Sequence, residues 1–196
     1  MKRLSRLLVA ALLPLLAAAP AWAVEASLSP GAQPLAVGSA FPDVSLAGQV
    51  PPEAATRLGI APGKAQRPVS ALGTEILVVE IFSMYCPYCQ KEAPEVNALY
   101  DLIDKRGLSN RIGVIGVGAG NSEAEVDIFR KKYDVPFALF ADPDFVVHKQ
   151  VGQVGTPFFY VLKKNPGGGY AVLGASLGVM DSPAAFLSRI TRAAGI

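Results

Sequence analysis

The 196-residue sequence is poor in metal-binding side chains and in net charge of either sign. It has two cysteines and one histidine, His148. These are too few ligands for a structural zinc site, which takes about four, and we expect neither a resident metal nor a cofactor. The net charge of +2 comes from the first 23 residues, since the remainder holds 15 basic and 16 acidic residues. Nothing in this charge balance favours a nucleic-acid partner.

The first 23 residues have the pattern of a secretory signal peptide. Residues 1–6 are basic, residues 7–19 are apolar, and an Ala-Trp-Ala sequence ends at Ala23, which fits a small-x-small cleavage site. The apolar run is short for a membrane span, so we expect cleavage after Ala23 rather than retention as an anchor. Residues 24–35 are expected to form a linker, and residues 36–196 one domain. The sequence therefore predicts an exported, periplasmic protein.

Beyond residue 70, segments typical of strands and helices alternate. Continuous apolar runs indicate strands buried on both faces, and apolar residues at helical spacing indicate helices. Residues 48–70 show little periodicity and are expected to hold a short strand or hairpin with irregular connections. The order predicts an α/β sheet with helices on both faces. The expected strands cover residues 75–82, 111–117, 137–140, 158–162 and 170–173, and the expected helices cover residues 87–106 and 144–150 and begin near residues 122 and 182.

The two cysteines lie close together in the sequence Cys86-Pro87-Tyr88-Cys89. A structural disulfide stabilises by closing a long loop, and this pair would close a very short one. In an exported protein such a pair indicates thiol–disulfide exchange. The strand before it and the helix after it place Cys86 at a helix start, where free N–H groups and the helix dipole favour a thiolate. Cys89 is expected one turn further along, more buried, where it can resolve a mixed disulfide.

Three segments resemble the thioredoxin-like superfamily, in particular its TlpA-like and AhpC/TSA-like exported thiol–disulfide oxidoreductases. Residues 79–94 resemble the active-site strand and helix, residues 155–157 the cis-proline loop, and residues 38–43 an upstream segment of this branch. The resemblance covers roughly residues 36–194. It implies a thioredoxin-like fold, with a central mixed sheet, helices on both faces and an extra βα insertion at residues 137–151 before the cis-proline loop.

The resemblance also implies roles for individual residues. Glu80 matches a buried acid that moves protons beneath the disulfide. Pro157 matches the cis-proline, and with Thr156 it would present backbone to the substrate, beside Pro87 and Tyr88. The expected substrates are disulfides or thiols of proteins, and a membrane electron donor is expected to restore the dithiol.

Several alternatives stay open at this point. Tyr85 stands where relatives usually carry tryptophan, and the Pro-Tyr dipeptide between the cysteines leaves the direction of electron flow open. Reduction of exported proteins is favoured, with thiol oxidation or isomerisation on the same site as the alternative. A copper-binding chaperone would use Cys86, Cys89 and His148. A peroxidase is a weaker alternative, because Ser83 stands where peroxiredoxins carry threonine.

Overall fold

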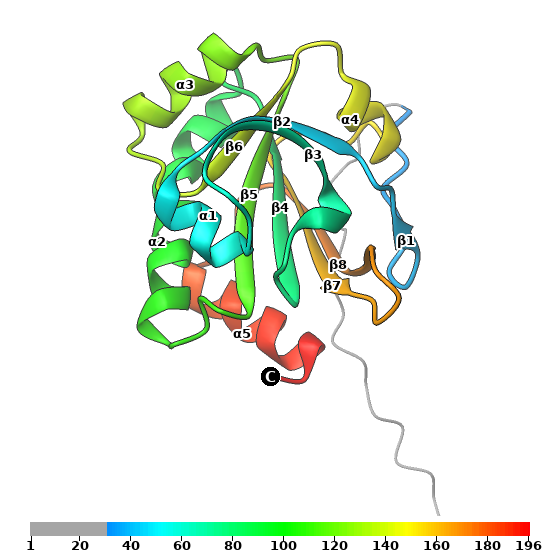
Figure 1. Ribbon diagram of the computed structural model, residues 1–196. Helices are drawn as coiled ribbons and strands as arrows, with labels where there is room; N and C mark the ends of the chain where they lie inside the picture. Colours follow the sequence, from blue (N-terminus) through cyan, green and yellow to red (C-terminus); the bar gives the residue numbers. More distant parts are fainter. Residues whose placement is uncertain (1–30) are drawn as a thin grey trace, which may run out of the picture.

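An eight-stranded mixed sheet forms the centre of the computed structural model, which describes residues 31–196 (Figure 1). The strand order is β1-β8-β7-β4-β5-β6-β2-β3. The predicted signal peptide and most of the predicted linker lie outside the described residues. The elements are β1 (Ala40–Phe41), β2 (Ser45–Val50), α1 (Pro52–Leu58), β3 (Gly63–Pro68), the 3-10 helix η1 (Val69–Ala71), β4 (Ile76–Phe82), α2 (Pro87–Lys105), β5 (Ile112–Ala119), α3 (Glu123–Lys132), β6 (Ala138–Asp142), α4 (Val146–Gln150), β7 (Phe158–Lys164), β8 (Tyr170–Leu177) and α5 (Pro183–Ala194).

The strand β4 occupies the middle of the sheet and leads directly to the cysteines. It pairs in parallel with β5 and antiparallel with β7, and all seven of its residues are buried. The continuous apolar run in the sequence predicted this burial, because a central strand covered by helices on both faces has no side exposed to water. The prediction of a mixed sheet is confirmed.

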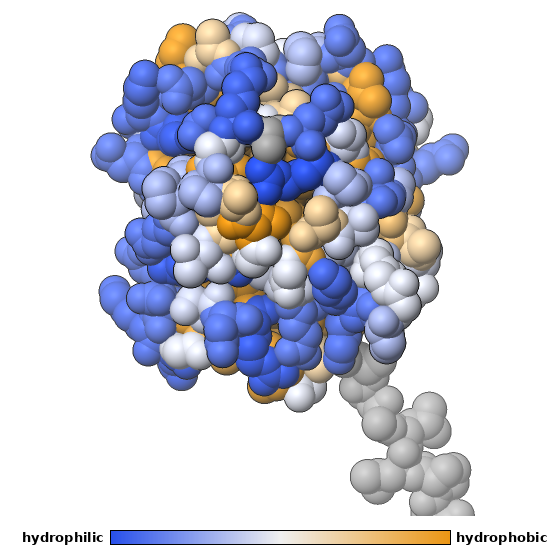
Figure 2. Space-filling view, in the orientation of Figure 1, coloured by the Kyte–Doolittle hydropathy of each residue, from blue (hydrophilic) through white to orange (hydrophobic). Residues whose placement is uncertain are grey.

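The two faces of the sheet carry separate apolar clusters. Alternate side chains of β4 point to opposite faces, so Val79 and Ile81 belong to one cluster and Val78 and Phe82 to the other. Helices α1 and α4 pack on the first face, and α2, α3 and α5 pack on the second. The prediction of helices on both faces is confirmed. Hydrophilic residues cover most of the face seen in Figure 2, with apolar residues exposed in small separate areas.

Helix α1 is absent from the sequence-based prediction for residues 48–70. It begins at Pro52, whose fixed φ suits the first helical position, and Gly59 ends it in the left-handed conformation at φ 65°. Its buried side chains are two alanines and Leu58. The two alanines are small and add little to a periodic apolar signal. A Cβ on Gly59 would lie 3.2 Å from the Cα of Gly73, so this crossing also needs a residue without a side chain.

The expected βα insertion is present as β6 and α4, directly before the cis-proline loop. The described end of the predicted linker is hydrogen-bonded to the domain. The Gln33 amide donates to the Gly152 carbonyl, and the Leu35 amide donates to the Tyr160 hydroxyl. The domain boundary at residue 36 stays a prediction. Within residues 31–196, no helix has the length and apolar character needed to cross a membrane.

Candidate active site

Cys86 occupies the N-cap position of α2, as the sequence predicted, and Pro87 is the first residue of the helix. The turn from β4 is closed by a hydrogen bond from the Cys86 amide to the Ser83 carbonyl, at 3.0 Å. No side chain caps the helix start. The free N–H groups of the first turn, and the positive end of the helix dipole, are therefore available to a sulfur anion.

The cis-proline loop lies against this sulfur. The peptide bond between Thr156 and Pro157 is cis, as the family resemblance implied. The Cys86 thiol is 3.3 Å from the Thr156 carbonyl oxygen, across 70 residues of sequence. The Pro157 carbonyl accepts the Gly178 amide at 2.9 Å, which links the loop to the end of β8. Two segments distant in sequence thus meet at the Cys86 sulfur.

The two free thiols have opposite environments. Cys86 is partly exposed, whereas Cys89 has no exposed surface. Partial burial acts to raise the pKa of Cys86, but hydrogen bonds with Thr156 and with the amides of Cys89 and Tyr88 outweigh it, so this pKa lies below the usual value. Burial, with the nearby charge of Glu80, raises the pKa of Cys89 well above its ordinary value. One thiol is therefore suited to attack, and the other needs a base.

Glu80 lies on the face of β4 that packs against α2, on the same side of the sheet as Cys89. It is 2% exposed, and its Oε1 atom has no hydrogen-bond partner among the described residues. Burial raises the pKa of Glu80 to about 8, with smaller contributions from the charges of Glu92 and Cys86. The expected burial is confirmed, and the proton-transfer role stays a prediction.

A second buried carboxyl, Glu92, was not identified from the sequence. It lies one helical turn after Cys89, is 2% exposed and accepts the Met180 amide at 2.8 Å. Burial raises the pKa of Glu92 to about 7, although the hydrogen bond from Met180 opposes the shift. The spacing could have indicated that Glu92 is buried, since Cys89, Glu92 and Val96 share one helix face and two of them are apolar.

The structure does not bring His148 to the sulfurs. Its helix α4 packs on the opposite face of the sheet from Cys89. The His148 Nε2 atom is 2.8 Å from the Val154 carbonyl oxygen, and its backbone amide donates to Asp142. In the part of the chain that the structure describes, no group of three or more His, Cys, Asp or Glu side chains is placed to hold a metal.

A groove of about 390 Å³ extends from the cis-proline loop along the surface. The Tyr88 side chain, 67% exposed, forms one wall, and the segment after β8 forms the other. The sequence-predicted substrate residues Tyr88, Thr156 and Pro157 are thus brought together, with Pro87 exposed beside them. None of the residues that line the groove is charged: Tyr88, Gly155, Thr156, Pro157, Leu177, Gly178 and Val179.

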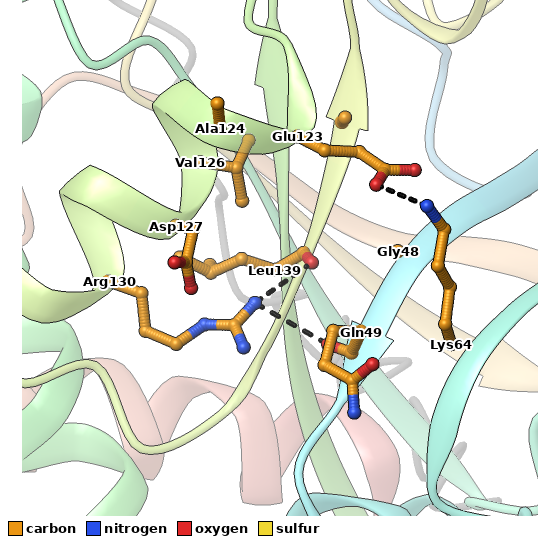
Figure 3. A pocket seen from close by; sticks show the side chains of 10 residues that line it. Gly48, Gln49, Lys64, Glu123, Ala124, Val126, Asp127, Arg130 and Leu139 are labelled. Carbon is orange, nitrogen blue, oxygen red and sulfur yellow. Dashed lines mark hydrogen bonds and ion pairs between the residues drawn. The ribbon is translucent and has the colours of Figure 1, made fainter.

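A second hollow, of about 300 Å³, lies away from the cysteines between α3 and strands β2 and β6 (Figure 3). Arg130 reaches across its floor and donates from one nitrogen, Nη2, to the carbonyls of Gln49 and Leu139, each at 3.4 Å. Lys64 and Glu123 form an ion pair at its rim, at 2.6 Å. β2 and β6 form a single residue pair, at Ala47. Arg130 therefore bridges two strands that are barely paired to each other.

The comparisons with known proteins agree with this geometry. The chain is 24% identical over 166 residues to the thiol-disulfide oxidoreductase ResA of Geobacillus thermodenitrificans, covering 84% of this chain and 86% of that protein. Against ResA of Bacillus thuringiensis it is 25% identical over 87 residues, which is 44% of this chain and about half (48%) of that relative.

Solved structures show the same fold. A Chlorobium tepidum structure assigned to the thiol:disulfide interchange protein DsbE covers 82% of this chain and 99% of its own, at 19% identity and a TM-score of 0.61. Peroxidoxin BcpB of Mycobacterium tuberculosis covers 81% of this chain and 96% of its own, at 16% identity and a TM-score of 0.56. The fold is thioredoxin-like. The model of the AhpC/TSA family matches residues 37–182, and the chain belongs to that family.

Proposed function

We propose that this protein is a thiol–disulfide oxidoreductase that reduces disulfides of exported proteins. The observation that carries the proposal is the contrast between its two thiols. Cys86 is accessible at a helix start with a lowered pKa, and Cys89 is fully buried with a raised one. An attacking thiol and a resolving thiol need this contrast, whereas two structural thiols do not.

The reaction has two exchange steps. The Cys86 thiolate attacks one sulfur of the client disulfide, forms a mixed disulfide and releases the other client sulfur as a thiolate. Cys89 then loses its proton and attacks the Cys86 sulfur. The bond between Cys86 and the client breaks, the second client thiolate leaves, and a Cys86–Cys89 disulfide remains. Two electrons have passed from the protein to the client.

Glu80 is the base for the second step. It lies near the buried Cys89 in a site with little access to water, and its ionised form can take the Cys89 proton. Because its pKa is about 8, only a minor part is ionised at pH 7. The resolving step should therefore accelerate as pH rises toward 8. In the reverse direction the protonated acid returns the proton.

The uncharged groove is suited to an extended client segment. Thr156 and Pro157 lie beside the Cys86 sulfur, where their backbone can align a chain on either side of a client cysteine. The exposed Tyr88 and Val179 offer apolar contact to the residues that flank this cysteine. Recognition would then depend on backbone and apolar contacts more than on charge.

The cycle needs a source of electrons on the outer side of the membrane. The sequence pattern of the first 23 residues supports export to the periplasm, where we expect a membrane electron donor to reduce the Cys86–Cys89 disulfide again. Without such a donor each molecule would reduce one client disulfide and stop.

The reduction potential tests the direction of electron flow. Equilibration of the mature protein with a series of glutathione redox buffers, followed by alkylation and a mobility shift, measures it. A potential below about −220 mV supports a reductase, and one near −120 mV would identify an oxidant on the same site. Alkylation is the suitable probe because the only tryptophan, Trp22, precedes the predicted cleavage site.

A further inference from the structure

The turn between β4 and α2 is held from the side by other elements. Met84, two residues before Cys86, donates its amide to the Asn121 Oδ1 atom at 2.8 Å. Its carbonyl accepts the side-chain amide of Gln90 at 2.7 Å. Both backbone polar groups of one turn residue are therefore engaged by side chains. Gln90 belongs to α2 and Asn121 to the β5–α3 junction, so the turn is tied to both at once.

Burial of the Asn121 side chain is unfavourable for the stability of the fold. It is 0% exposed, and its Nδ2 atom has no hydrogen-bond partner among the described residues. A buried amide nitrogen without a partner is unfavourable. A Cβ on Gly118 would lie 3.1 Å from the Cβ and Oδ1 atoms of Asn121, so position 118 must stay small. An apolar side chain could fill this space without an unpaired amide, but it could not accept the Met84 N–H.

The same junction also holds Tyr85, the residue directly before Cys86. The Tyr85 hydroxyl donates to Glu125 Oε1, in the first turn of α3. Glu125 is itself fixed, because its other carboxylate oxygen accepts the amide and the hydroxyl of Ser122, each at 2.7 Å. The Glu125 amide in turn donates to the Ser122 hydroxyl oxygen at 3.4 Å, which completes a capping box with the contact from the Ser122 amide. Both residues that precede the nucleophile are thus fastened to residues 121–125.

We propose that Asn121 is a positioning residue for Cys86, acting through Met84, and that Glu125 supports it through Tyr85. Together they hold the turn so that the sulfur stays against the first N–H groups of α2. The influence of a helix terminus falls off within one turn, so a small displacement of the sulfur weakens it. Neither side chain needs to touch the sulfur. The proposal rests on the proposed function in one respect, that Cys86 is the nucleophile.

The rate of Cys86 alkylation by iodoacetamide as a function of pH tests the proposal. All variants carry Cys89→Ala, so that only one sulfur reacts. In Asn121→Ala we expect the midpoint of the profile to move to higher pH and the rate at pH 7 to fall about fivefold to tenfold, as expected for loss of one hydrogen bond to a buried group. In Tyr85→Phe, where the lost bond is exposed, we expect about a twofold fall.

Asn97→Ala is the matched control. Asn97 also donates a side-chain hydrogen bond to a distant backbone group, the Tyr133 carbonyl at 2.8 Å, and also keeps one buried polar atom without a partner. It lies two turns further along α2 than Cys89. This variant should lose stability as Asn121→Ala does, with the parent alkylation profile unchanged.

An Asn121→Ala profile that coincides with those of the parent and of Asn97→Ala overturns the proposal. If Asn121→Ala does not fold, Tyr85→Phe decides, and an unchanged profile in that surface variant overturns it equally. A parent whose Cys86 reacts no faster at pH 7 than cysteine in a short peptide would contradict the proposed function. A reactive parent with unaffected variants contradicts only the positioning role.

Discussion

Replacing Glu80 with glutamine removes a titrating carboxyl from beneath the cysteines, and the new side chain has nearly the same size and shape. In the folded protein burial raises the pKa of Glu80 from an ordinary value of 4.5 to about 8. The folded state therefore holds a proton that the unfolded chain releases, so the stability of the wild type falls as pH rises from about 4.5 to about 8. Over this whole window the loss is about 5 kcal/mol, or about 1.4 kcal/mol per pH unit.

The Glu80→Gln variant has no ionising group at this position, so it does not lose stability in this way as pH rises. Between pH 5.5 and pH 7.5 we expect the free energy of unfolding of the reduced wild type to fall by about 3 kcal/mol relative to Glu80→Gln. The raised pKa of Glu92 lowers stability over part of the same range in both proteins. Urea unfolding at several pH values, with a reductant present, measures the difference.

A matched control removes a carboxyl that water surrounds. Asp101 is an exposed residue of α2, and Asp101→Asn should follow the wild-type dependence on pH. If the free energy of unfolding of Glu80→Gln also falls with pH as steeply as that of the wild type from pH 5.5 to 7.5, Glu80 does not titrate as a buried acid. The assignment of Glu80 as the base for Cys89 would then be wrong as well.

Three further predictions concern the thiols, the base and the sheet edge. Cys89→Ala should accumulate mixed disulfides with client proteins on non-reducing gels, whereas Cys86→Ala should not; equal trapping by both variants would contradict the assignment of the nucleophile. Glu80→Leu should raise the melting temperature and slow turnover of a disulfide substrate, while alkylation of Cys86 changes much less; turnover that is unchanged from pH 5 to 9 would rule out proton transfer. Arg130→Gln should lower the free energy of unfolding by about 1 kcal/mol, because β2 and β6 lose their bridge, and should leave the alkylation of Cys86 at the wild-type rate.

The sequence predicted those parts of the site that follow from chain order and apolar pattern. A continuous apolar run placed β4 in the interior, and the strand-to-helix junction placed Cys86 at the helix start and Cys89 one turn inside. Pro157 is a different case. A trans bond is the usual state before proline, so only the resemblance to a family implied the cis form that the structure shows.

The supporting polar residues could not be predicted in the same way. Glu92 stands between Lys91 and Ala93, and Asn121 precedes a helix start, where polar residues are common on the surface. Glu92 accepts the amide of Met180, after β8, and Asn121 accepts the amide of Met84, after β4. Both are contacts between residues far apart in the sequence, which local patterns do not encode.

The contact between Cys86 and Thr156 has a consequence for the protein before it folds. Both cysteines lie in one short segment, but the cis-proline loop that contacts Cys86 lies some seventy residues later in the chain. This loop is placed beside Cys86 only when β7 pairs with β4. Pairing over such a distance carries a large cost in loop closure. The unfolded chain therefore carries an ordinary pair of thiols, and their unequal reactivity develops only with the completed sheet.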